Sequence, residues 1–119
     1  MDFALTEEQT AIFDMAYSFG QDRIAPFARD WERDGTIPKE LWPEIAALGL
    51  GGLYVSEESG GAGLSRLDAT LVFEALSMAC PSVAAFLSIH NMCAKMIDNF
   101  ADDAMKARVL PRALTMETV

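Results

Sequence analysis

The chain has 119 residues, of which 51% are hydrophobic and 23% are charged. This composition is typical of one folded globular domain, and it excludes a disordered segment. The net charge of −9 argues against binding to nucleic acid or to an anionic membrane, because both partners require a basic protein surface.

Nothing in the sequence indicates secretion or insertion into a membrane. The segment Met1-Asp2-Phe3-Ala4-Leu5 lacks the basic and apolar regions of a secretory signal. No apolar run approaches the ~20 residues of a membrane span. Cys80 and Cys93 are too few for a metal site or a disulfide framework. We therefore expect an intracellular protein of a reducing compartment.

The first third of the chain predicts two helices. Thr6-Glu7-Glu8-Gln9 has the form of a capping box, and apolar residues then recur with helical spacing as far as Phe19. Pro26 must end or kink this helix, because its ring removes a backbone hydrogen bond. A second, short helix is expected to run from Phe27 through Trp31 and to stop at Asp34-Gly35.

The segment from Ile37 to Ser65 predicts one helix and a turn. Pro38 lies near the start of the helix, where proline is favoured, and Gly49 is a suitable residue to end it. Residues 50–55 are expected to form a short extended apolar segment. A glycine-rich turn, Gly60-Gly61-Ala62-Gly63, follows.

The chain from Ser65 onwards is predicted to form further helices. Ser65 caps the next helix, with Asp68 three residues later, and Pro81 stops that helix. Ser82 is expected to cap a helix from Val83 to Phe100, which is apolar nearly all round and should be buried on most sides.

A last helix is expected to start at Asp102-Asp103, where negative charge is favourable, and to end at Pro111. The sequence therefore predicts an all-α fold of five or six packed helices, without strands or repeats.

Two glycine-rich segments could contact a phosphate group. Gly49-Leu50-Gly51-Gly52-Leu53-Tyr54 partly matches a dinucleotide fingerprint, but Tyr54 replaces the third glycine and the segment follows a helix rather than a strand. Gly60-Gly61-Ala62-Gly63 could cradle a phosphate with its N–H groups. Two carboxylates precede it, however, and no Lys-Ser or Lys-Thr follows, so a tight surface turn is favoured.

Two titratable residues are candidate catalytic groups. His90 is the single histidine, and Asp98 is too far along the helix to orient it, so a hydrogen-bonded core role is favoured. Glu74 could act as a base. A partly buried Glu74 that forms an ion pair with Arg23 or Lys95 is the favoured interpretation.

Ala85, Ser88, Ile89 and Met92 follow the spacing that places side chains on one face of a helix. The small residues at positions 85 and 88 leave space either for a ligand or for the close approach of another helix. From spacing alone, helix packing is favoured over a binding site.

Several motifs, in this order and spacing, resemble the amino-terminal helical domain of the acyl-CoA dehydrogenase family. They are Leu5-Thr6-Glu7-Glu8-Gln9, Ile24-Ala25-Pro26 with Asp34, Leu48-Gly49-Leu50, Glu58 to Ser65, Glu74-Ala75-Leu76 and Lys106 to Pro111. The resemblance covers residues 1–119 as one domain. Ser88 to Cys93, Met96-Ile97-Asp98 and Thr115-Met116-Glu117 are most similar to the isobutyryl-CoA dehydrogenase branch, which acts on short branched acyl groups.

The resemblance implies an FAD-dependent homotetramer that dehydrogenates an acyl-CoA substrate and passes electrons to electron-transferring flavoprotein. It also implies a middle β-domain and a carboxy-terminal helical bundle, both absent from this chain, which would hold the flavin and the catalytic glutamate. No catalytic, cofactor-binding or metal-binding residue is then expected within residues 1–119, and this piece alone is expected to be inactive.

The resemblance places Ala85, Ser88, Ile89 and Met92 on or beside positions that line the base of the acyl pocket. For this face it therefore favours a substrate-binding pocket wall over helix packing. Phe100-Ala101 departs from the Phe-Gly usual in the family, a minor change at a helix end.

Two other functions fit the residues. One is a non-enzymatic helical module that binds a partner or lipid through an apolar face. The other is an acyl-CoA oxidase-like flavoprotein. The sequence that follows Val119 separates the module from an enzyme, and a comparison of oxygen with electron-transferring flavoprotein as acceptor separates the oxidase from the dehydrogenase.

Overall fold

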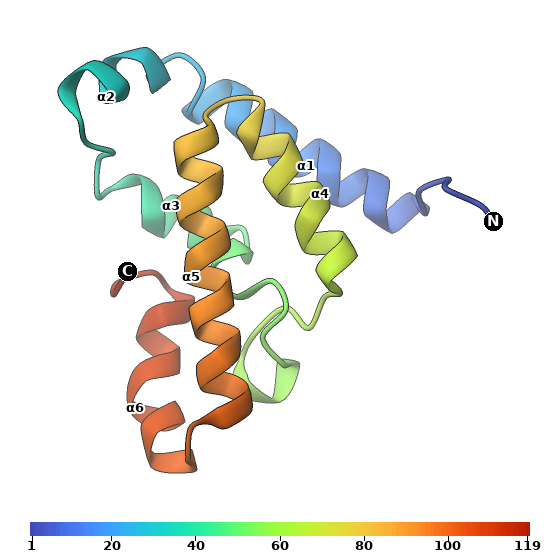
Figure 1. Ribbon diagram of the computed structural model, residues 1–119, viewed down its shortest axis with the longest axis vertical. Helices are drawn as coiled ribbons and strands as arrows, with labels where there is room; N and C mark the ends of the chain where they lie inside the picture. Colours follow the sequence, from blue (N-terminus) through green and yellow to red (C-terminus); the bar gives the residue numbers. More distant parts are fainter.

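Six α-helices and two short 3-10 helices make up the molecule, and no strand is present (Figure 1). The computed structural model describes all 119 residues, Met1–Val119. The α-helices are α1 (Glu7–Arg23), α2 (Ala28–Asp34), α3 (Leu41–Ala47), α4 (Arg66–Ser77), α5 (Pro81–Phe100) and α6 (Asp103–Leu114), and the 3-10 helices are η1 (Leu50–Gly52) and η2 (Glu57–Ser59). The predicted all-α fold is confirmed. None of the helices combines the length and the apolar composition that crossing a bilayer requires.

Polar side chains begin three helices, as the sequence predicts. The Thr6 hydroxyl accepts a hydrogen bond from the N–H of Gln9, and the Gln9 side chain accepts one from the N–H of Thr6. Ser65 and Asp68 form the same reciprocal pair before α4, and the Asp102 carboxylate caps α6. Such caps satisfy N–H groups that the first turn leaves free and are worth ~1 kcal/mol each.

The ends of the first three helices also agree with the sequence. α1 ends at Arg23, before Pro26. Gly35 ends α2 with a φ of 72°, and Gly49 follows α3 with a φ of 82°. These left-handed conformations carry little steric cost for glycine.

The segment between α2 and α4 differs from the sequence prediction in two places. The third helix begins at Leu41 rather than near Pro38, because a separate turn precedes it, in which the N–H of Leu41 bonds to the C=O of Pro38. Residues 50–55, predicted to be extended, instead contain η1 and a bend.

α4 ends at Ser77, before Pro81, as predicted, whereas two other predictions near proline residues are wrong. Pro81 is the first residue of α5, and Cys80 holds the N-cap position predicted for Ser82. Proline suits this position, because the first turn of a helix provides no acceptor for an N–H. Pro111 lies inside α6, which continues to Leu114. The cost is limited to one hydrogen bond near the end of a helix that packs against α5.

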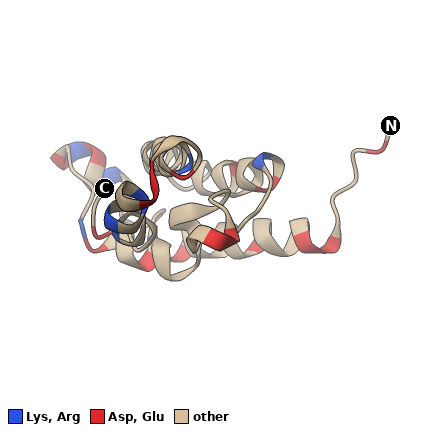
Figure 2. Ribbon diagram, turned by 90° about the horizontal axis from the view of Figure 1, so that it is seen from below, with Lys and Arg blue, Asp and Glu red and all other residues tan.

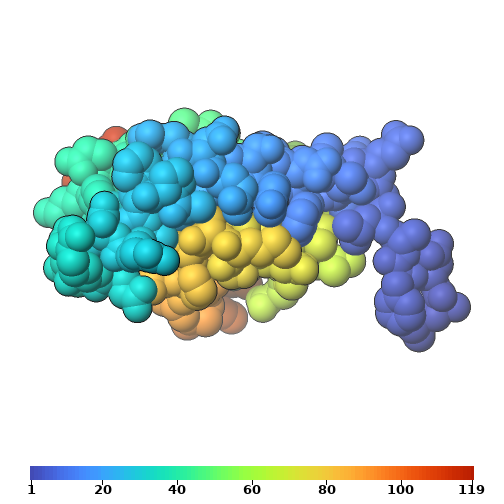
Figure 3. All heavy atoms as spheres, turned by 90° about the horizontal axis from the view of Figure 1, so that it is seen from above, coloured from blue at the N-terminus to red at the C-terminus, as the bar shows by residue number.

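The helices form a thin slab of 43 × 41 × 20 Å in which α5 is central. α4 and α6 both pack against α5, and α1 packs against α4. Gly20 of α1 permits this last contact, because a Cβ there would lie 3.6 Å from Leu76 of α4 and 3.2 Å from the Cβ of Ala79, just after α4. Figure 3 shows α1 along one edge of the slab, with the N-terminal residues extending beyond it.

The main core lies where α1, α3, α4, α5 and η1 meet. Its fully buried large residues are Ile24, Ile45, Leu50, Leu53, Val72, Leu76, Val83 and Leu87. A smaller cluster of Val55, Ala94 and Leu110 joins α5 to α6. Met116 folds back against Gly51 with a φ of 57° and is buried, so the end of α6 also closes onto η1.

Acidic residues are spread over the slab, including along α1, whereas basic residues gather on α2 and α6 (Figure 2). On α2 the charges are paired locally. The Arg33 guanidinium lies 3.2 Å from the Asp30 carboxylate and 3.1 Å from that of Asp34. All three side chains are well exposed, so these pairs contribute little to stability.

The glycine-rich turn is tight, as predicted. Gly60 has a φ of 94° and Gly63 a φ of 64°. Gly61 is required for a different reason, since a Cβ at this position would collide with the carbonyl oxygen of Val55. The turn therefore depends on glycine both for its backbone angles and for close packing.

We expect Gly61→Ala to lower the free energy of unfolding by about 3 kcal/mol, because two backbone segments must separate to accept the methyl group. The control is Gly35→Ala, where the φ is positive but the surrounding space is open. There we expect a loss of about 1 kcal/mol from backbone strain alone. Urea denaturation measures both values, and equal losses would contradict the steric argument.

Candidate functional site

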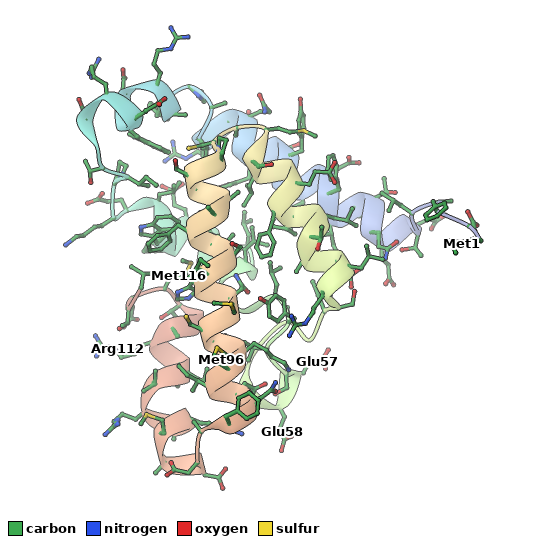
Figure 4. All side chains as sticks on the ribbon, in the orientation of Figure 1. Met1, Glu57, Glu58, Met96, Arg112 and Met116 are labelled. Carbon is green, nitrogen blue, oxygen red and sulfur yellow. The ribbon has the colours of Figure 1, made fainter.

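One side of α5 carries a row of exposed apolar side chains, which we call the α5 stripe. Its members are Phe86, Ile89, Met92, Met96 and Phe100, three or four residues apart, with exposed fractions from 39% to 82%. Figure 4 labels Met96 within this row. The expectation that this helix is buried on most sides is therefore wrong. Its neighbours α4 and α6 flank it and leave this face uncovered.

The four residues predicted to form a pocket wall lie together at one edge of the stripe. Ile89 and Met92 belong to the stripe, Ala85 is exposed beside them, and Ser88 is half-buried on the side of α4. The Ser88 hydroxyl donates to the C=O of Ala85 at 2.7 Å. The structure brings the four side chains onto one surface, and their role in binding stays a prediction.

Ala85 and Ser88 also border a shallow hollow of about 450 Å³, which we call the α4–α5 hollow. Its lining residues are Thr70, Phe73, Glu74, Ser77, Pro81, Ala84, Ala85 and Ser88. The candidate face thus joins an exposed apolar ridge to an adjacent recess. A ridge beside a recess can contact an apolar group on two of its sides.

On its opposite side, α5 presents a buried asparagine to the segment that follows α3. Asn91 is fully buried and accepts a hydrogen bond from the N–H of Leu53 at 2.7 Å. Its amide donates to the C=O groups of Leu50 and Leu87, both at 3.0 Å. These bonds satisfy backbone groups that pairing with a strand would otherwise satisfy. They explain why residues 50–55 form η1 and a bend.

Asp98, seven residues after Asn91, holds η2. Its carboxylate accepts hydrogen bonds from the hydroxyl of Ser59 and from the N–H and hydroxyl of Ser56, and Lys95 Nζ lies 3.6 Å away. The Ser59 hydroxyl and then the Ser56 N–H stabilise the ionised carboxylate most, against the opposing effect of burial. They lower the pKa of Asp98 to about 2.

Sequence reasoning assigned no role to Asn91 and none to Asp98 beyond its distance from His90. Their spacing could have indicated a shared role, because two polar residues seven positions apart on an apolar helix lie on the same face. Polar groups on a buried face require hydrogen-bond partners. The identity of those partners, in a segment about forty residues earlier, could not be read from the spacing.

The glycine-rich turn has no N–H group left for a phosphate. All four of its N–H groups donate within the chain at 2.9 Å, from Gly60 to Glu57, Gly61 to Ser56, Ala62 to Gly52 and Gly63 to Val55. The prediction of a tight structural turn is therefore confirmed, and the alternative of a phosphate-binding turn is not.

His90 has the hydrogen-bonded role that the sequence favours. It is half-buried, and its Nε2 lies 2.8 Å from the carbonyl oxygen of Ala113. Because a carbonyl can only accept, Nε2 carries the proton in this contact. His90 therefore ties α5 to the last turn of α6.

Glu74 does not form the expected ion pair. It is exposed, while Arg23 binds Glu44 at 2.7 Å and Lys95 lies next to Asp98. Both cations proposed as its partners are thus engaged elsewhere. Tertiary packing turns this side of α4 to solvent, which leaves Glu74 away from both cations.

The two cysteines are free thiols in different surroundings. Cys80 is buried before α5, as expected of a small apolar residue, whereas Cys93 is exposed. No group of three or more histidine, cysteine, aspartate or glutamate side chains is arranged to hold a metal ion.

Comparisons with known proteins agree with the geometry of the fold. Residues 6–117 match the family described as acyl-CoA dehydrogenase, N-terminal domain. The chain is 44% identical over 115 residues to the mitochondrial isobutyryl-CoA dehydrogenase of Dictyostelium discoideum, an alignment that covers 97% of this chain and 28% of that protein.

Two solved structures are also similar. Butyryl-CoA dehydrogenase from Megasphaera elsdenii superimposes with a TM-score of 0.89 and 32% identity over 100% of this chain and 32% of that one. The FAD complex of PigA gives a TM-score of 0.90 and 29% identity, with the same coverage of 100% and 32%. The chain spans less than a third of the length of these relatives.

Acid should weaken the contact between α5 and η2. Because the folded pKa of Asp98, about 2, lies below the usual aspartate value, its stabilisation is complete above about pH 4 and is lost as the pH falls towards 2. Asp98→Asn should lower the free energy of unfolding at neutral pH by about 2 kcal/mol and reduce the loss of stability below pH 4.

The control for this experiment is Asp14→Asn, which alters an exposed residue of α1. Denaturation by urea at a series of pH values measures the difference from the wild type. A difference between wild type and Asp98→Asn that stays constant from neutral pH to pH ~2 would contradict the assignment.

Proposed function

Because the chain belongs to the acyl-CoA dehydrogenase family, we propose that residues 1–119 are the amino-terminal domain of an FAD-dependent enzyme that dehydrogenates short, branched acyl-CoA thioesters. The observation that carries this proposal is the 44% identity to an isobutyryl-CoA dehydrogenase over 97% of the chain. The α,β-dehydrogenation would take place in the complete protein, and the catalytic base would lie outside this chain.

FAD is the proposed cofactor of the complete protein, and the similarity to the FAD complex of PigA supports it. The residues of this chain do not fit the pyrophosphate of FAD. The turn at Gly60–Gly63 is the segment best suited by composition, and its N–H groups are all used within the chain. We assign FAD binding to a middle β-domain and a carboxy-terminal helical bundle beyond residues 1–119.

The contribution of this domain to substrate binding would be a wall of the acyl pocket formed by Ala85, Ser88, Ile89 and Met92. The exposure of Ala85, Ile89 and Met92 on one face of α5, with Ser88 half-buried beside them, supports this role. The Ser88 hydroxyl is already bonded to the C=O of Ala85, so the face offers an acyl chain an apolar surface without a free donor. Burial of each methylene against such a surface is worth ~0.8 kcal/mol.

The rest of the α5 stripe would be the surface on which the other domains assemble. Phe86, Met96 and Phe100 are large and exposed, and a contiguous apolar row of this kind marks an interface. The complete protein would form a homotetramer and pass electrons to electron-transferring flavoprotein. It would work in the cytoplasm of a bacterium or in the mitochondrial matrix of a eukaryote.

The direct test compares the full-length protein with residues 1–119. We expect the full-length protein to carry flavin, seen in its visible spectrum, and to oxidise isobutyryl-CoA with electron-transferring flavoprotein as acceptor. Residues 1–119 incubated with FAD should retain none. Stoichiometric flavin on the short chain, or a flavin-loaded full-length protein that oxidises no acyl-CoA, would contradict the proposal. Faster turnover with oxygen would instead indicate an oxidase.

A second prediction concerns chain length. In the full-length protein, Ser88→Leu should reduce kcat/KM for longer acyl-CoAs far more than for isobutyryl-CoA, because the larger side chain fills space that longer chains need. One methylene that fits the pocket poorly typically changes the difference in activation free energy between two substrates by about 1–3 kcal/mol. The measurement is kcat/KM over a series of acyl-CoAs, with melting temperatures recorded alongside.

The matched control is Ser18→Leu, which places the same side chain on an exposed position of α1. It should leave the chain-length profile unchanged. If Ser88→Leu slowed all substrates in parallel with a loss of stability, Ser88 would be a packing residue only.

A further inference from the structure

The α4–α5 hollow has one large side chain, and it comes from α4. Phe73 is half-buried and packs against the main core. Opposite it, α5 contributes Pro81 at its first turn and then only the small side chains of Ala84, Ala85 and Ser88. The space beside Ser88 therefore exists because α5 is lined with small residues, and Phe73 limits how far that space extends towards α4.

The hydroxyl groups around the hollow are already satisfied by their own helices. Thr70 donates to the C=O of Arg66 and Ser77 to the C=O of Glu74, both at 2.8 Å. Ser88 donates within α5 in the same way. An alkyl group entering the hollow would leave none of these hydroxyls without a partner, so its entry would not incur the cost of unpaired polar groups.

Charge restricts the ligand further. Glu74 is the single charged residue that lines the hollow, and it is exposed at the rim. No lysine or arginine lines the hollow to receive an anion. A ligand that ends in a carboxylate would therefore meet a like charge, whereas a neutral alkyl chain would not.

We propose that Phe73 determines the acyl-chain length that the full-length protein accepts, by closing the α4 side of a pocket for neutral alkyl chains whose other side is Ala85 and Ser88. This inference rests on the proposed function and deepens it. It adds a residue of α4 to a site otherwise assigned to α5, and it names the substrate class as acyl groups without a terminal carboxylate.

The test uses the full-length protein and S-alkyl-CoA thioethers from propyl to octyl, which bind without reacting, measured by titration calorimetry. For the wild type, affinity should rise with each methylene and then level off or fall where the chain reaches Phe73. In Phe73→Ala the rise should continue to longer chains, about fourfold per added methylene. A thioether with a terminal carboxylate should bind more weakly than the alkyl compound of equal length.

Phe73→Leu, which preserves more of the packing, should give an intermediate shift and provides a second variant if the alanine variant folds poorly. The control is Phe19→Ala on α1, another half-buried phenylalanine that packs against the same core. It should lower the melting temperature as Phe73→Ala does while leaving the chain-length profile of the wild type.

Three outcomes would overturn the inference. An unchanged profile in Phe73→Ala and Phe73→Leu would show that Phe73 is a packing residue and would leave the proposed function intact. Equal or tighter binding of the carboxylate-ended thioether would refute the assigned ligand class. Failure of the wild type to bind any thioether and to oxidise any acyl-CoA would refute the proposed function together with this inference.

Discussion

Two buried polar side chains on one side of α5 hold together parts of this domain that are far apart in the sequence. Asn91 binds the backbone at the two ends of η1, and Asp98 binds the backbone and hydroxyl groups around η2. Because their partners lie in the loop that follows α3, that loop cannot shift without leaving buried polar groups unpaired. Such groups cost about 1–3 kcal/mol each. The rotation of α5 about its own axis is fixed by the same contacts.

This arrangement explains the unusual distribution of residues around α5. Its buried side includes an asparagine and an aspartate, whereas its exposed side includes Phe86, Ile89 and Met96. Polar groups can lie inside because each has partners. The exposed apolar groups are left largely uncovered by the chain, apart from Phe86, whose ring stacks on that of Trp42 at 4.4 Å between centroids. A helix that faced only solvent on this side would be polar there, so the exposed row supports the proposal that other parts of a complete protein cover this surface.

The shape of the molecule fits a role as one wall of a larger assembly. A slab 20 Å thick has little interior, and only 26 of 119 residues are buried. The face that α5 presents has small residues, internally bonded hydroxyls and large apolar side chains, which suit contact with an alkyl group. It lacks a nucleophile beside a base, so the chemistry of the proposed reaction would be supplied by other domains.

The sequence by itself determined what depends on local interactions. Caps such as Ser65, the glycines at positions 35 and 49, and helical spacing predicted five or six helices in their order along the chain. Spacing also predicted the shared face of residues 85, 88, 89 and 92. Order and spacing of motifs also sufficed to identify the family. These features follow from contacts within a few residues, or from a pattern that can be read along the chain.

Tertiary structure decided what depends on residues distant in the sequence. The apolar run at residues 50–55 is predicted to be extended. It forms η1 and a bend instead, because Asn91 supplies hydrogen bonds to its backbone. The sequence predicts an ion pair of Glu74 with Arg23 or Lys95, yet Arg23 binds Glu44 and Lys95 lies next to Asp98. The composition of α5 could not reveal which side is covered, because burial depends on where α4 and α6 pack. The hollow beside Phe73 exists for the same reason, since it forms only where two helices meet.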